Sequence, residues 1–110
     1  MKIEVNDIDD ITILVIDGML TIGSEKQFSE VFQAQIQKGC QKILLDMTKV
    51  KYIDSLGIGQ IAGGFTSLNE INGKLVLART NEKIRELLRL TGLQNHIKTY
   101  PTVEDAIQDL

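Results

Sequence analysis

The sequence predicts an α/β fold in which about four helices pack against a single-layer mixed sheet of four to five strands. Short apolar segments alternate with segments of helical period along the chain, in the order β-β-α-β-α-β-α-β-α. Crossovers from strand to helix to strand are right-handed and make neighbouring strands parallel. A chain of 110 residues, 43% of them hydrophobic, can bury one core but not two. We therefore expect one domain.

The first two strands and the first helix are predicted before residue 40. The run from Lys2 to Gly18 contains two strand-like segments, KIEVN and ITILVID, with a turn rich in Asn and Asp between them. A helix is expected after Ser24, because Ser24 and Gln27 form a capping-box pattern and apolar residues then recur at helical spacing. Gly39 is expected to end this helix.

The rest of the chain alternates between apolar strands and helices. Ile43–Leu45 and Leu75–Ala78 are unbroken apolar runs, which are typical of parallel strands covered on both faces. A central helix is predicted between them, from about Leu56 to Asn69. A third helix, a short strand and a terminal helix complete the chain, beginning after Asn81, near Ile97 and after Thr102.

Composition and charge exclude several classes of function. The net charge is −3 and no segment concentrates Lys and Arg, so direct binding to nucleic acid is not expected. Cys40 and His96 are the only cysteine and histidine, too few for a disulfide or a structural zinc site. No apolar run is long enough to cross a bilayer and no signal-peptide pattern is present, so we expect a cytoplasmic chain without membrane insertion. Neither a metal nor a cofactor is expected.

The most informative segment is KYIDSLGIG, residues 51–59, which places a hydroxyl at the predicted start of the central helix. A helix N-terminus presents unpaired N–H groups and the positive end of the helix dipole, so it could accommodate a phosphate on Ser55. Ser55 is therefore a candidate phosphoacceptor. A helix cap formed by Asp54 or Ser55 explains the same residues without phosphorylation, and the two roles are compatible.

A face of small residues is predicted on the same helix. Gly59, Gly63 and Gly64 fall off its apolar face, beside Gln60, although an interior glycine costs a helix roughly 1 kcal/mol relative to alanine. Residues this small let another protein come close, so the face predicts a docking surface. The alternatives are a well-packed helix that tolerates poor helix formers, or an irregular helix start at Gly57 and Gly59.

Two enzyme motifs overlap these residues, and neither fits. Gly57–Ala62 matches the dinucleotide pattern G-x-G-x-x-A, but the preceding strand is expected to end near Asp46, well before the first glycine. A hydrolase serine would need Gly two residues before it, where Ile53 stands, and a histidine that this region lacks. We therefore expect no catalytic residue and no enzyme activity.

The run KILLDMTKVKYIDSLGIG, residues 42–59, resembles the STAS domain family, and within it the stand-alone bacterial anti-sigma-factor antagonists. Members of that family carry an apolar strand ending in Asp, a short loop, and then D-S-S/T-G-L-G. The resemblance extends to Gly73–Leu77 and to Ile84–Leu93. It implies that residues 1–110 form one STAS-like domain.

The resemblance also implies a partner and a mechanism. An anti-sigma factor with serine-kinase activity would bind the unphosphorylated chain and release it after phosphorylating Ser55, and a protein-serine phosphatase would reverse the modification. Transcription would then be regulated indirectly. The residues expected to contact the partner lie before the first helix and along the start of the central helix: Thr21, Ser24, Asp54, Ser55, Leu56, Gly57, Gly59, Gln60, Gly63 and Gly64.

Two departures from the family pattern bear on the choice of partner. Leu56 replaces the usual second Ser or Thr, and Thr21 stands where the family's G-x-L-D has an acidic residue that commonly helps to contact the kinase. We expect an intact switch with altered partner specificity. STAS domains also serve as non-enzymatic subunits of stress-signalling and lipid-transport complexes, so a constitutive subunit in which Ser55 only caps the helix is the alternative.

Overall fold

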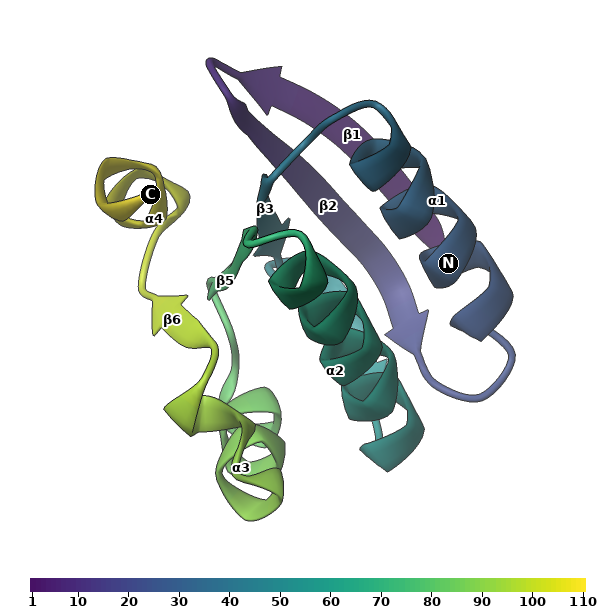
Figure 1. Ribbon diagram of the computed structural model, residues 1–110. Helices are drawn as coiled ribbons and strands as arrows, with labels where there is room; N and C mark the ends of the chain where they lie inside the picture. The colour runs from purple at the N-terminus through teal and green to yellow at the C-terminus, as the bar shows by residue number, and fades with distance from the viewer.

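The computed structural model describes residues 1–110 and contains one six-stranded mixed sheet with four helices packed against it (Figure 1). The strands are β1 (Lys2–Ile8), β2 (Ile11–Leu20), β3 (Lys42–Asp46), β4 (Val50–Ile53), β5 (Lys74–Ala78) and β6 (Lys98–Tyr100). The helices are α1 (Glu25–Gln37), α2 (Ser55–Glu70), α3 (Glu82–Thr91) and α4 (Val103–Asp109), and a 3-10 turn over Leu93–Asn95 precedes β6. The predicted fold class is confirmed.

The sheet follows the order β1-β2-β3-β5-β6. β1 and β2 form an antiparallel hairpin, whereas every other strand pair is parallel, as expected when helices connect the strands. β2 is long enough to pair twice. Its first half lies beside β3, and its last residues lie beside β4, with Gly18 opposite Val50. β4 is the one strand that the sequence pattern does not predict.

Helices cover both faces of the sheet. Figure 1 shows α1 and α2 side by side on one face, and α4 on the opposite side. The larger apolar cluster lies beneath α1, α2 and α3 and includes Phe32, Ile61 and Leu77. The smaller cluster packs Ala106 of α4 against residues such as Leu44. β3 and β5 are therefore buried on both faces, which explains their unbroken apolar runs.

The predicted helix ends are largely confirmed by the backbone. Asn81 and Thr102 cap α3 and α4 with their side chains, and Gly39 ends α1 with a positive φ angle of 91°. The structure also shows α3 ending at Gly92, where φ is 79°. The start of α1 differs from the prediction. Ser24 occupies the N-cap position but its side chain caps no N–H of the helix. It bonds to tertiary partners instead, as described below.

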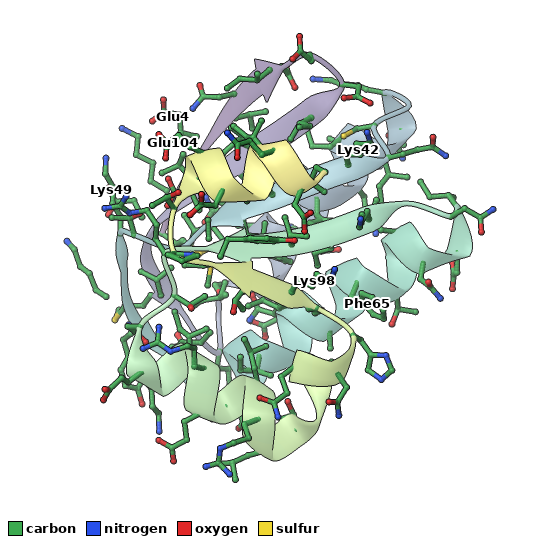
Figure 2. The ribbon with its side chains drawn as sticks, turned by 90° about the vertical axis from the view of Figure 1, so that its left-hand side faces the viewer. Glu4, Lys42, Lys49, Phe65, Lys98 and Glu104 are labelled. Carbon is green, nitrogen blue, oxygen red and sulfur yellow. The ribbon has the colours of Figure 1, made fainter.

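One ionic contact ties the hairpin to the end of the chain. The ammonium group of Lys42 lies 3.0 Å from a carboxylate oxygen of Asp10 and donates to the Leu110 carbonyl at 3.3 Å. Lys42 is labelled in Figure 2. The hydrogen bond from Lys42 lowers the pKa of Asp10 below its ordinary value. This contact joins the β1–β2 turn to the C-terminal end of α4.

Candidate functional site

Ser55 is the first residue of α2, directly after β4, and Asp54 is the cap of that helix. One carboxylate oxygen of Asp54 accepts hydrogen bonds from the backbone N–H groups of Leu56 and Gly57, both at 3.0 Å. Ser55 is exposed and takes no part in the cap. The sequence allowed either Asp54 or Ser55 to cap the helix. In the structure Asp54 is the cap, and the Ser55 hydroxyl is not needed for it.

The cap also determines what a phosphate on Ser55 would meet. Two of the free N–H groups at the start of α2 are already bonded to Asp54. A phosphoryl group would keep the favourable helix dipole, but it would compete with the neighbouring carboxylate for those donors. The phosphate would consequently face solvent or a bound partner more than the helix itself.

Gly64 was expected off the apolar face of α2, and the structure contradicts this, because Gly64 is buried. Gly57, which was expected among the contact residues, is buried as well. A Cβ atom at Gly57 would lie 1.9 Å from the carbonyl oxygen of Leu20, so the glycine allows α2 to contact the end of β2. A Cβ at Gly64 would lie 2.9 Å from two ring atoms of Phe32. Gly64 therefore allows α1 and α2 to approach closely. Both glycines are buried and serve packing.

Gly59 and Gly63 do lie on an open face, because a Cβ at either position would meet no atom within 4 Å. They border a groove of about 490 Å³ between α1 and α2. Phe28 and Phe32, stacked with their ring centroids 5.6 Å apart, form the apolar part of the groove, and Ser55 contributes to its lining. The other lining residues are Glu25, Ser29, Gln33, Leu56, Gln60, Gly64 and Ser67.

Thr21, Ser24 and Gln60 form a hydrogen-bonded network that holds the β2–α1 loop against α2. The Gln60 side-chain amide donates to the Thr21 carbonyl at 2.8 Å. The Ser24 hydroxyl lies 2.9 Å from the Gln60 amide oxygen, and it accepts from the Thr21 backbone N–H at 3.1 Å. These polar groups are engaged within the chain, so their main effect is to position the loop.

Four exposed apolar side chains lie at the end of β2, in the loop after it, on β4 and at the start of α2, and of these only Leu56 was among the expected contact residues. The exposed fractions are 58% for Met19, 72% for Ile22, 56% for Tyr52 and 52% for Leu56. Met19 lies opposite Tyr52 across β2 and β4, and Ile22 lies in the loop that Gln60 holds. We call these four residues the apolar rim. The signal for it was the pairing of β4 with β2, which the sequence pattern did not reveal.

The chain offers no group of three or more His, Cys, Asp or Glu side chains placed to hold a metal. None of its helices is both long and apolar enough to span a bilayer.

The fold and this site define a small α/β domain with an exposed serine on a separately capped helix, bordered by a groove and an apolar rim. The sequence model of the STAS domain family matches residues 2–106. The chain therefore belongs to the STAS family.

The more similar proteins include regulators of sigma factors. An anti-sigma-B factor antagonist of Listeria monocytogenes is 34% identical over 101 residues, which cover 89% of this chain and 85% of that protein. A crystal structure from Thermotoga maritima, described as a candidate anti-sigma factor antagonist, matches with a TM-score of 0.90 at 31% identity, covering 97% of this chain and 92% of that one. The phosphorylated form of SpoIIAA from Bacillus matches with a TM-score of 0.79 at 19% identity over 98% of both chains, and so shares the fold.

Proposed function

We propose that this protein is an anti-sigma factor antagonist that is switched by phosphorylation of Ser55. The unphosphorylated chain binds an anti-sigma factor with serine-kinase activity, and the phosphorylated chain releases it. A protein-serine phosphatase restores the first state. The protein acts in the cytoplasm as one domain over residues 1–110, by binding and without catalysis, a cofactor or contact with nucleic acid.

The observation that carries this proposal is that Asp54 caps α2 while the Ser55 hydroxyl takes no part in the cap. Because Asp54 caps α2 through two hydrogen bonds, the exposed Ser55 hydroxyl can be modified without breaking the cap. The names of the relatives support the class of partner. That a protein of the same fold is known in a phosphorylated form supports the kind of modification.

The docking surface in this proposal combines the apolar rim with the groove between α1 and α2. Large exposed apolar side chains that gather on one part of a soluble domain often mark a protein interface. Leu56 extends the rim where family members carry a second hydroxyl, and Thr21 stands where the family pattern has an acidic residue. The partner surface should accordingly be apolar opposite Leu56 and need no cation opposite Thr21.

Phosphorylation would act on the interface more than on the fold. A phosphate adds about −1.5 to −2 charges at neutral pH, beside Asp54 and next to the apolar rim. A partner covering the rim would have to desolvate that charge while the nearest backbone donors stay bonded to Asp54. Binding should therefore weaken while the domain stays folded.

The test is to incubate the chain with a candidate anti-sigma kinase and ATP, and to follow it by intact mass and phosphosite mapping. We expect a single phosphate on Ser55, no incorporation in Ser55→Ala, and normal incorporation in the control Ser67→Ala, which lies in the same groove. A phosphate on Thr48 or Ser67 would contradict the assignment. Equal partner affinity before and after phosphorylation would favour the constitutive subunit of a stress-signalling or lipid-transport complex.

A further inference from the structure

One of the smaller surface cavities lies at the carboxyl ends of β5 and β6, and neither Ser55 nor the apolar rim lines it. It has a volume of about 240 Å³. Its lining consists of two arginines, three hydroxyl residues and a proline: Arg79, Arg85, Thr80, Thr99, Tyr100 and Pro101. No carboxylate is among these residues.

The two arginines of this cavity have no ionic partner in the chain. The two ion pairs present join Lys26 to Glu30 and Lys42 to Asp10. Glu82 and Glu86 flank Arg85 on α3 but neither comes within ion-pair distance of it. Since the chain as a whole carries a net charge of −3, two unpaired arginines around one cavity are not part of a generally basic surface.

The backbone fixes both arginines at the cavity. Arg79 adopts a φ of +59°, which is uncommon for a residue with a long side chain, and its N–H donates to the Tyr100 carbonyl at 2.9 Å. Arg85 is held from the other side, because one of its guanidinium nitrogens donates to the Thr80 carbonyl. A guanidinium group has five N–H donors, so Arg85 keeps most of them for a ligand.

The hydroxyl of Tyr100 does not compete for this space. It donates to the carboxylate of Asp109, which lies outside the lining of the cavity. The hydroxyls of Thr80 and Thr99 complete the polar lining. The cavity thus presents cations and neutral hydroxyls, with the positive N-terminal end of α3 starting two residues after Thr80.

We propose that Arg79 and Arg85 bind the phosphate group of a small molecule in this cavity. Two guanidinium groups match the two negative charges of a phosphate, and their planar forks can each donate two parallel hydrogen bonds to its oxygens. The hydroxyls of Thr80 and Thr99 add further donors. The ligand is inorganic phosphate or a small phosphate monoester, and the site is independent of the phosphorylation proposed for Ser55.

The test is an NMR titration of the ¹⁵N-labelled protein at constant ionic strength, with inorganic phosphate in one arm and glycerol 3-phosphate in the other. Saturable shifts are expected at the backbone amides of Thr80, Arg85 and Thr99 and at the side-chain N–H groups of both arginines. Equal affinity in the two arms would identify free phosphate as sufficient, whereas tighter binding of glycerol 3-phosphate would identify a monoester. Glycerol alone should cause no shift.

The decisive variants remove one charge at a time. Arg79→Asn keeps the positive φ accessible, since Asn adopts it more readily than most residues, and Arg79→Gly provides a second variant that fits the same backbone. Each of these, and Arg85→Gln, should weaken binding about tenfold or more, because each loses charge-assisted hydrogen bonds. Arg89→Gln on the same helix removes a charge outside the cavity and should bind as the wild type does.

Three results would overturn the proposal. They are the absence of saturable shifts, shifts that centre on the start of α2, and equal weakening by Arg89→Gln, which would reflect net charge alone. Ser55→Ala should leave phosphate binding unchanged. The site and the phosphorylation switch can therefore fail separately.

Discussion

Asp54 and Ser55 are neighbours in the sequence, but only one of them holds the helix. Removing the Asp54 carboxylate leaves the N–H groups of Leu56 and Gly57 without their partner. We expect Asp54→Ala to lower the free energy of unfolding by about 1 kcal/mol, the usual cost of losing a cap. Ser55→Ala should change it by less than about 0.5 kcal/mol, as an exposed position does.

Urea denaturation of the two variants beside the wild type measures this difference. If Ser55→Ala lowers the free energy of unfolding as much as Asp54→Ala does, the Ser55 hydroxyl also supports the fold. That result would contradict the assignment of the cap to Asp54 alone.

The effect of replacing a glycine of α2 by alanine depends on the atoms that surround its Cβ position. Gly63→Ala should raise the free energy of unfolding by about 0.5–1 kcal/mol, because the site is open and alanine favours the helix. Gly64→Ala should lower it by about 1–3 kcal/mol, because the added carbon overlaps the ring of Phe32. Gly57→Ala should cost at least as much, since the obstacle is the backbone of Leu20.

A substitution at Gly63 can test partner binding without lowering the stability of the fold. Gly63→Gln places a long side chain in the groove between α1 and α2 without a clash inside the fold. Under the proposed function it should reduce partner affinity while the melting temperature stays the same or rises, since glutamine favours the helix more than glycine does. The affinity is measured by calorimetric titration. If it is unchanged, the groove is not part of the interface.

At the scale of elements, Gln60 joins α2 to the β2–α1 loop that carries Ile22. Gln60→Ala removes the hydrogen bond to the Thr21 carbonyl and the contact with Ser24, so the loop should open more often. We expect faster amide hydrogen exchange in residues 21–24 of the isolated chain, and weaker binding of the partner.

Gln33→Ala is the matched control for Gln60→Ala. Gln33 also bridges α1 to α2, through the Ser67 hydroxyl at 2.9 Å, but it does not touch the loop. It should leave exchange in residues 21–24 at the wild-type rate. If both variants accelerate exchange equally, the helix pair as a whole, and not Gln60, positions the loop.

The short helix α4 is tied to β6 by the hydrogen bond from Tyr100 to Asp109. This bond raises the pKa of Tyr100 to about 12 and lowers the pKa of Asp109. The neutral phenol donates to the ionised carboxylate, so the contribution to stability is complete between the ordinary pKa of Asp109, 3.8, and the ordinary phenol pKa of 10.0. It is lost as the pH rises through about 12, and also as the pH falls through the lowered pKa of Asp109.

Ultraviolet titration measures this pKa when the curve of Tyr100→Phe is subtracted from that of the wild type. Asp109→Asn should return the phenol pKa toward its ordinary value of 10.0, since the charged acceptor is gone. An ordinary pKa in the wild type would show that α4 is not held by this bond.

At the scale of the whole molecule, lowering the pH should reverse part of the change in charge that phosphorylation causes. The second ionisation of a phosphate on Ser55 lies at about pH 6, so lowering the pH from about 7.5 to about 5.5 should partly restore partner binding by the phosphoprotein. Ser55→Asp should bind more tightly than the phosphoprotein at neutral pH and change less between the two pH values, because a carboxylate carries one charge and titrates lower.

Calorimetric titration of the three forms with one partner preparation checks this prediction. The unphosphorylated chain controls for titration of the partner itself. If the affinity of the phosphoprotein for the partner does not change with pH, the charge of the phosphate is not the cause of release.

The sequence predicts the elements whose signals are local. The caps at Asn81 and Thr102 and the stop at Gly39 need only their own neighbours, and the apolar runs of β3 and β5 report burial on two faces. β4 was not predicted because VKYI is short and owes its pairing to the distant end of β2. Such a partner is visible only in three dimensions.

The errors within the site have the same origin. Ser24 matches a capping pattern, but its hydroxyl bonds to Thr21 and lies beside Gln60, a contact that no local pattern encodes. Gly64 was placed outside because a helical wheel describes one apolar face, whereas α2 packs against both the sheet and α1. The apolar rim comes from separate segments and could not be assembled from the sequence alone.

The double pairing of β2 also has a consequence for the order of folding. Its hairpin with β1 closes over a two-residue turn, whereas its pairing with β4 joins Gly18 to Val50 and must close a long loop first. Contacts between distant segments form late, because closing the loop between them lowers the chain entropy before the contacts contribute any favourable free energy. The corner that carries Ser55 is therefore completed after the hairpin, and a kinase of the proposed kind would meet this corner only once β2 and β4 have paired.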